Sequence, residues 1–180
     1  MFKRIAAVIL VLLTCTLTGC ISATAGLKSF VDSTDGYQFL YPNGWVEYRA
    51  KNGPDVVFHD LIEQSENVSV VISPVSDGKT LKDLGSPGEV GYILSKSAIA
   101  PPGSGLEAEL VDAEAREGNG KIYYLLEYAV KFPGNQERHN LASVVVSRDK
   151  LYTFSASSTE KRWPKVEKQF EQIVDSFSVY

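Results

Sequence analysis

Three consecutive runs of strand-like sequence in the second half of the chain constrain the fold more than any other feature. They are rich in Val, Tyr, Leu, Phe and Thr, and they cover Lys121–Lys131, Leu141–Ser147 and Leu151–Ser157. Polar turn residues separate them at 133–135 and at 148–150. The first run is apolar on both faces, so it requires cover on both faces of its sheet. The pattern predicts three antiparallel strands near the middle of a sheet, with other elements packed above and below.

The remaining sequence predicts further short strands and two helices. Strand patterns cover residues 37–41, Trp45–Arg49, Val56–Leu61, Asn67–Val75 and Leu106–Arg116. The last of these forms a hairpin with the 121–131 run through Asn119-Gly120. Apolar spacing predicts a helix from Pro87 to about Ile99, after one helical turn near Leu81. A final helix carries one apolar stripe, made of Val166, Phe170, Ile173, Val174 and Phe177. This order predicts an α+β sandwich with a mainly antiparallel sheet.

The N-terminus has the features of a bacterial lipoprotein signal. Lys3 and Arg4 precede Ile5–Leu13, an apolar run that is too short to span a bilayer. Leu17-Thr18-Gly19-Cys20 follows and resembles a lipobox. The resemblance implies cleavage before Cys20 and lipidation of that residue. The alternative is an ordinary signal peptide with a chance cysteine.

This signal divides the chain into three segments: signal peptide 1–19, lipidated cysteine with a flexible tether 20–30, and folded domain 31–180. Removal of the signal leaves 16 basic and 22 acidic residues, a formal net charge of −6. A nucleic-acid-binding domain normally shows a basic excess, so no nucleic-acid partner is expected. With Cys20 acylated, the domain has no thiol for a disulfide, a metal site or nucleophilic catalysis.

No motif in the sequence proposes a reaction. The two histidines do not form a His-Glu-x-x-His pattern, and neither a Gly-x-Ser-x-Gly elbow nor a Walker-type loop occurs. Asp32–Gly36 resembles a calcium loop only faintly, because its glycine would place Val31 at the first ligand position, and we interpret it as a turn. Absence of these motifs does not disprove catalysis, and an enzyme of unknown reaction stays an alternative. The residues themselves indicate no required cofactor, and the expectation of a protein that is not an enzyme comes from the family resemblance described below.

Two pairs of side chains are candidates for weak divalent-cation binding, of zinc or calcium. They are His59 with Asp60 and His139 with Glu137, each placing an imidazole and a carboxylate close together. The alternative for each pair is a solvated histidine beside a strand end.

Lys161-Arg162-Trp163 opens the final helix and is a candidate docking site, since Arg and Trp are frequent at binding hot spots. The alternative is a core tryptophan with a solvated rim.

An ordered series of short motifs resembles the PsbP family of extrinsic photosystem II proteins. The series is Tyr37-x-Phe39-x-Tyr41-Pro42-x-x-Trp45, Asn67-Val68-Ser69-Val70, Gly85-Ser86-Pro87-x-Glu89, Gly120-Lys121-x-Tyr123-Tyr124, His139-x-Leu141, Lys150-Leu151-Tyr152, Lys161-Arg162-Trp163 and Ser176-Phe177-Ser178-Val179. With a lipobox in front, the chain is most similar to the cyanobacterial members. The resemblance runs from about residue 30 to the C-terminus and implies an α/β/α sandwich around an antiparallel sheet flanked by helices.

The resemblance also implies a non-catalytic role beside the oxygen-evolving complex, on the lumenal side of the thylakoid membrane. Its partners would be photosystem II subunits and, through the lipid, the membrane, with the domain itself monomeric. Plant members help photosystem II to retain calcium and chloride and carry a longer polar arm before the domain. This chain has only a short tether, which favours assembly or stabilisation of photosystem II over ion retention. His139 falls at the family's His-x-Leu position, which implies a role in docking or metal contact. The alternative is a periplasmic or lumenal lipoprotein that binds a metal or a small ligand.

Overall fold

The computed structural model describes residues 25–180 except 50, 52 and 135. The expected signal peptide and Cys20 therefore lie outside the described residues. Within the described part of the chain, no helix is both long enough and apolar enough to cross a membrane.

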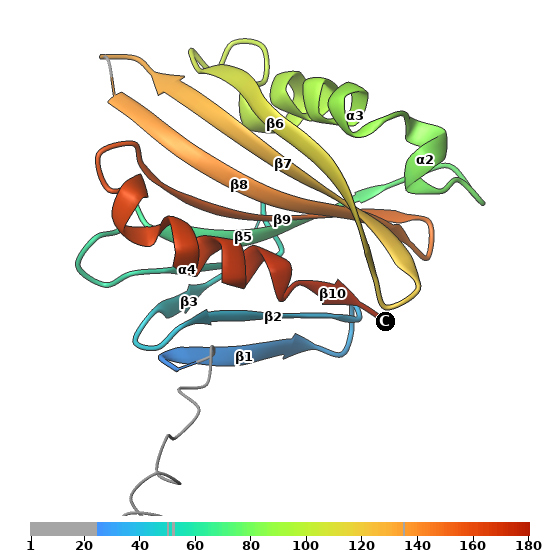
Figure 1. Ribbon diagram of the computed structural model, residues 1–180, viewed down its shortest axis with the longest axis horizontal. Coiled ribbons are helices and arrows are strands. Elements are labelled where there is room, and N and C mark those ends of the chain that lie inside the picture. Colours follow the sequence, from blue (N-terminus) through green and yellow to red (C-terminus); the bar gives the residue numbers. More distant parts are fainter. Residues whose placement is uncertain (1–24, 50, 52, 135) are drawn as a thin grey trace, which may run out of the picture.

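A seven-stranded sheet forms the centre of the molecule (Figure 1). Every neighbouring pair is antiparallel, and the spatial order is β3-β4-β5-β9-β8-β7-β6. The strands are β3 Val46–Tyr48, β4 Val56–His59, β5 Asn67–Pro74, β6 Glu107–Gly118, β7 Lys121–Phe132, β8 Gln136–Ser147 and β9 Lys150–Thr159. The prediction of three adjacent central strands is confirmed, because β7, β8 and β9 are neighbours inside the sheet. The β6–β7 hairpin turns at Asn119 and Gly120, whose φ angles of 51° and 71° suit a tight turn.

Two helices and a π-helical turn cover one face of this sheet (Figure 1). They are α2 Leu81–Leu84, α3 Pro87–Leu94 and η1 Ser95–Ile99. The Ser86 side chain caps α3 by accepting the Glu89 N–H, and the Ser86 backbone N–H donates to the Glu89 carboxylate at 2.8 Å. The predicted helix is confirmed, with its last turn wound as a π-helix. Under it lies a core that includes Val90, Leu94, Tyr124, Leu126, Tyr128 and Val144.

The opposite face is covered by the C-terminal helix and by a second, three-stranded sheet (Figure 1). These elements are α4 Trp163–Asp175, β1 Leu27–Asp32, β2 Tyr37–Pro42 and β10 Ser178–Val179. The whole apolar stripe predicted for the last helix is buried. Phe177 reaches the core from just beyond the helix end. The α+β class and the sandwich with helices on both faces are confirmed, whereas the second sheet was not predicted.

Two predicted boundaries are wrong. Strand β1 begins at Leu27, so the tether does not extend to residue 30. Phe30 contacts Phe39 with ring centroids 5.1 Å apart, and this aromatic contact draws the segment onto the domain. At the other boundary, β4 ends at His59, and Leu61 lies in the loop that follows instead of in the strand.

Candidate functional site

His139 lies in a cage of two carboxylates and an indole on the face covered by α4. Its Nε2 is 2.7 Å from Glu127 Oε1, and its Nδ1 is 3.0 Å from Glu160 Oε2. Glu127 comes from β7, diagonally across from His139 in the strand register, and Glu160 comes from the turn before α4. A carboxylate only accepts hydrogen bonds, so both contacts are hydrogen bonds only when both ring nitrogens carry protons.

The indole of Trp163 closes this cage. It stacks on the His139 ring with centroids 4.0 Å apart and planes 14° apart, and it meets Phe170 edge-on at 6.0 Å. His139 and Trp163 are each 7% exposed. The docking prediction is therefore corrected for Trp163. Its ring fixes the start of α4 against the sheet and offers almost no surface to a partner.

Glu137 is not the partner that the sequence predicted for His139. Its side chain is exposed at the start of β8, and its backbone carbonyl accepts the N–H of Glu160 at 3.0 Å. The carboxylates that meet the ring come instead from the neighbouring strand β7 and from the turn before α4. Cross-strand register could have identified Glu127, but only after the three strands had been aligned residue by residue.

His59 and Asp60 also do not form a pair of side chains. His59 Nδ1 is 2.9 Å from the Asp60 backbone carbonyl. The Asp60 carboxylate Oδ1 accepts the N–H groups of Ile62 and Glu63, both at 2.7 Å. These hydrogen bonds, that of Glu63 first, hold the pKa of the Asp60 carboxyl below its usual value. Asp60 therefore stabilises a loop.

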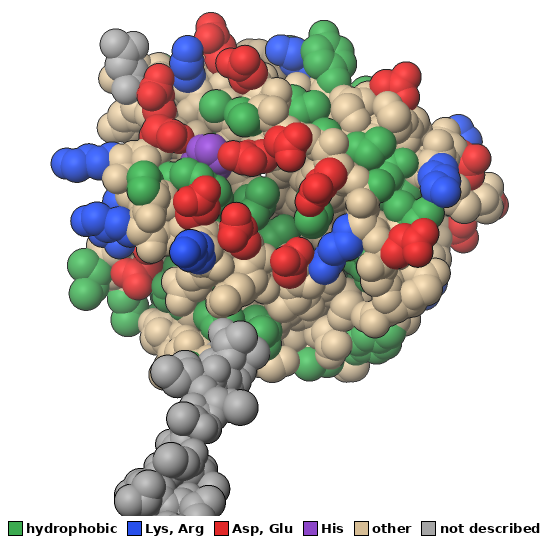
Figure 2. Space-filling view, viewed as in Figure 1, with side chains coloured by type: hydrophobic (Ala, Val, Ile, Leu, Met, Phe, Trp, Pro, Cys, Tyr) green, Lys and Arg blue, Asp and Glu red, His purple; other side chains and the backbone are tan. Residues whose placement is uncertain are grey.

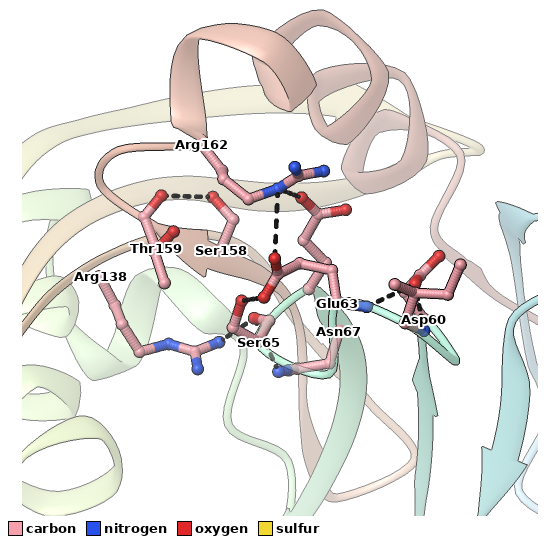
Figure 3. A network of polar contacts seen from close by, with 10 residues as sticks. Asp60, Glu63, Ser65, Asn67, Arg138, Ser158, Thr159 and Arg162 are labelled. Atoms are coloured by element: carbon pink, nitrogen blue, oxygen red, sulfur yellow. Dashed lines mark hydrogen bonds and ion pairs between the residues drawn. The ribbon is translucent and has the colours of Figure 1, made fainter.

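That loop, 60–66, is tied to the rest of the molecule by two arginines (Figure 3). Arg162 donates from Nε to the buried Glu66 carboxylate, and Glu63 Oε2 lies 4.0 Å from the same nitrogen. Arg138 donates to the Ser65 carbonyl. The hydrogen bond to Glu66 raises the pKa of Arg162, which is thus held in an internal ion pair. Of the three predicted docking residues, only Lys161 is exposed, whereas Arg162 is partly buried and Trp163 is buried.

The same loop carries two apolar side chains into solvent. Ile62 is 96% exposed and Leu61 is 63% exposed. The Asp60 N–H donates to the Glu66 carbonyl at 3.0 Å and closes the loop beneath them. Sequence reasoning missed this feature because it placed Leu61 in a strand. The sequence signal that could have identified this exposed tip is the apolar pair Leu61-Ile62, which stands between the acidic residues Asp60 and Glu63.

Among the described residues, the one group of three side chains spaced to hold a metal ion is Asp32, Asp35 and Asp55. Protein donors already occupy it: Asp32 accepts two backbone N–H groups at 2.9 Å and faces Arg49 at 3.4 Å. Lys150 donates to Asp35 at 2.8 Å, and the Tyr37 hydroxyl donates to Asp55. The arrangement is that of a braced turn, in agreement with the turn interpretation of Asp32–Gly36.

The face that carries α4 is predominantly acidic (Figure 2). Five carboxylates line a hollow of about 330 Å³ between α4 and strands β6 and β7: Asp112, Glu114, Glu127, Glu171 and Asp175. Arg116 pairs with Asp175 at 3.4 Å.

Each ionisable side chain in the His139 cage and in the Arg162 contacts has an internal partner. These two groups of contacts are therefore suited to holding the elements of the fold together.

Comparison with known proteins identifies a close set of relatives. The model of the PsbP family matches residues 25–179. CyanoP of Thermosynechococcus vestitus is 52% identical over 184 residues that span 100% of both chains. The PsbP-like protein 1 of Arabidopsis thaliana chloroplasts is 36% identical over 86% of this chain and 65% of its own length. The solution structure of cyanobacterial PsbP (CyanoP) from Synechocystis superposes with a TM-score of 0.75 at 46% identity, covering 92% of this chain and 99% of that one.

Proposed function

The chain belongs to the PsbP family, and we propose that it is a non-catalytic accessory protein of photosystem II. It acts on the lumenal side of the thylakoid membrane, is held there by lipid on Cys20, and supports assembly or stability of the oxygen-evolving complex. Identity that extends over the full length of CyanoP supports a shared role for the whole chain and not for one domain only.

The geometry around His139 carries the non-catalytic part of this proposal. A general base or nucleophile must present a reactive atom to a substrate. Here both ring nitrogens of His139 face carboxylates at 2.7 and 3.0 Å, and one flat side of the ring is covered by Trp163. The cage thus serves to fix α4 onto the sheet, and it leaves neither ring nitrogen of His139 free to act on a substrate.

We place the docking site on the loop 60–66. Ile62 and Leu61 offer an apolar tip, and internal hydrogen bonds hold the loop in one conformation before a partner arrives. Preorganisation lowers the entropy cost of binding, so a small apolar tip can anchor a complex. Exposed Lys161 lies on the rim of an adjoining concave surface of about 640 Å³, shared with Ser65 and Arg138. Of the docking residues expected from the sequence, Lys161 remains in this proposal. Ile62 and Leu61 take the place of Trp163 as the apolar contacts.

The lipid strengthens this docking by raising the local concentration of the domain at the membrane surface. A tethered domain can occupy a weak site that the same domain free in solution would leave largely empty. The protein can therefore bind assembling complexes transiently and still be retained beside them.

Removal of the protein from cells tests the proposed role. Photosystem II should accumulate more slowly after photodamage or during greening, whereas oxygen evolution per assembled complex should remain close to normal. Reintroduction of the wild-type chain should restore the rate. Unchanged accumulation, or complete loss of oxygen evolution from assembled complexes, would contradict an accessory role.

The alternative, a lipoprotein that carries a metal, receives less support. The His139–Glu137 and His59–Asp60 pairs do not bring their side chains together. A weak zinc or calcium site at His139 would need the cation to displace one of its two present carboxylate contacts. We retain weak binding of this kind only as a secondary proposal. Its test is a zinc titration of wild type and His139→Ala, and equal affinity would exclude His139 as a ligand.

A further inference from the structure

A pocket of about 240 Å³ lies on the sheet face opposite the His139 cage, beside the π-helical turn η1. Its walls are mostly apolar and include Leu94, Ile99, Leu106 and Val130. Arg138 from β8 is the one charged side chain that lines it, and no carboxylate does so among the described residues. The pocket is thus an apolar space with a single cation on its wall.

Arg138 has no acidic partner within the described part of the chain. Its Nε and Nη2 donate to the Ser157 hydroxyl at 3.0 and 2.7 Å, and Nη2 also donates to the Ser65 carbonyl. No described carboxylate lies within ion-pair distance of it, and its Nη1 has no hydrogen-bond acceptor among the described residues. Burial lowers the pKa of Arg138, as expected for a guanidinium that is partly desolvated without a counter-ion. A partly desolvated cation without an ion-pair partner is a favourable place for an anion to bind.

Asn140 adds a second polar side chain to the same wall. It lines the pocket two residues after Arg138, on the same side of β8. Its Oδ1 is buried and has no hydrogen-bond partner among the described residues. With Oδ1 turned into the protein, the amide Nδ2 group, which makes no hydrogen bond to the described residues, is the part of Asn140 left to donate to a ligand. Arg138 Nη1 and the Asn140 amide can thus donate to the same ligand.

We infer that this pocket binds a small single-chain anion, with its oxyanion head at Arg138 and Asn140 and its apolar body along Leu94, Ile99 and Val130. A cavity of about 150 Å³ accommodates benzene, so about 240 Å³ suits a body on the order of ten heavy atoms. A diacyl lipid is far larger, whereas a medium-chain carboxylate fits. Arg138 also holds the loop 60–66 through the Ser65 carbonyl, but the apolar body of the pocket lies under Leu94 and Ile99, and the proposal does not depend on photosystem II.

Octanoate, with ten heavy atoms, is the probe for this site. The full-length protein is labelled at Val and Leu methyl groups in non-ionic detergent micelles and titrated by NMR. We expect saturable shifts at Val130 and Leu94. Octanamide has the same number of heavy atoms without the charge, and butyrate keeps the charge on a shorter chain, so both should bind at least about tenfold more weakly. Micelles take up octanoate equally in every sample, so differences between variants report on the protein.

Three variants locate the site. Arg138→Gln should weaken octanoate binding about tenfold or more, and Val71→Phe should do the same by filling the pocket. Lys131→Gln removes a cation from the neighbouring strand on the opposite face and should leave binding unchanged.

The proposal is overturned if octanoate leaves Val130 and Leu94 unshifted, or if Arg138→Gln and Lys131→Gln bind it equally. If Arg138→Gln does not fold, Val71→Phe decides, and undiminished binding by that folded variant rejects the pocket. Equal affinity for octanoate and octanamide would likewise reject an anion site.

Discussion

At the scale of single residues, aromatic contacts fix the start of α4. Trp163 meets the His139 ring face to face, and Phe170, which has no exposed surface, meets both Trp163 and Trp45 edge-on. Edge-to-face and stacked pairs each add about 0.5–1.5 kcal/mol beyond their burial. The contacts around His139 thus stabilise the packing of α4 against strands β7 and β8.

Phe170→Ala should destabilise the protein by about 3–5 kcal/mol, because it removes a fully buried ring and leaves a cavity between α4 and the sheet. The free energy of unfolding is measured by urea denaturation. Lys168→Ala, at an exposed position on the same helix, is the matched control and should change stability little. A loss below about 1 kcal/mol for Phe170→Ala would contradict the assigned helix face.

Asp60→Asn should destabilise the protein at neutral pH, and its effect should fade in acid. The N–H groups of Glu63 and Ile62 lower the pKa of the folded-state carboxyl. Stability from such a group is present above its unfolded pKa of about 3.9 and is lost as the pH falls through the folded-state pKa. Denaturation midpoints of wild type and variant are compared from neutral pH down to acid.

Asp77→Asn controls for the change in net charge, since Asp77 is exposed and makes no hydrogen bond to the described residues. A stability difference between Asp60→Asn and wild type that stays constant across the whole pH range would show that the carboxylate charge does not stabilise the loop.

At the scale of elements, α3 lies so close to the sheet that a Cβ at one of its positions would force a neighbouring leucine side chain to shift. A Cβ on Gly91 would lie 2.8 Å from two methyl carbons of Leu110 and 3.2 Å from one of Leu126. The Tyr128 hydroxyl donates to the Gly91 carbonyl at 3.0 Å and fastens the helix there. Tyr128 also lines the pocket beside η1.

Gly91→Ala should cost about 1–3 kcal/mol of unfolding free energy, because the added methyl overpacks this contact. Gly88→Ala on the same helix faces open space and is the matched control. That change should be neutral or stabilising by up to about 1 kcal/mol. Equal effects of the two substitutions on thermal unfolding would contradict the close approach of α3 to the sheet.

The elements that sequence predicts well are those whose pattern is local. The β7–β9 runs have strand composition with polar turns between them, Asn119-Gly120 is a local hairpin signal, and the apolar stripe of α4 follows helical spacing. The second sheet was missed because β10 has only two residues and depends on pairing with β2, which lies far away in sequence. Short strands formed by such distant pairing leave almost no local signal.

The candidate site was predicted less well, for a related reason. Sequence reasoning paired His139 with Glu137, two residues away, whereas the fold brings Glu127 and Glu160 to the ring. Trp163 beside two cations suggested an exposed edge, but the stack on His139 buries it. Contacts across strands depend on register, which a single sequence specifies only weakly.

At the scale of the whole molecule, the proposed lipid on Cys20 would lie only a few residues before the folded domain. The ordered domain begins by Leu27, so few residues separate Cys20 from strand β1. With the proposed lipid in place, so short a connection would keep the domain close to the membrane surface, where the proposed docking loop 60–66 would meet a membrane-bound partner.

Cys20→Ser should release the protein from membranes, because the proposed lipid supplies most of the membrane affinity. Cells expressing wild type or variant are fractionated, and the membranes are washed with high salt. Wild type should stay in the membrane fraction, and the variant should appear in the wash. Tight retention of the variant after the wash would exclude lipid as the anchor.

Co-purification of photosystem II subunits with the tagged, lipidated chain measures the proposed docking itself. Wild type should recover these subunits from detergent-solubilised membranes, and Leu61→Ser/Ile62→Ser should recover several-fold less. The control, Tyr92→Ser/Ile93→Ser, changes an adjacent exposed apolar pair on α3 and should recover as much as wild type. Equal recovery by both double variants would reject the loop 60–66 as the docking site. Absence of photosystem II subunits from the wild-type sample at every stage of assembly would contradict the proposed function itself.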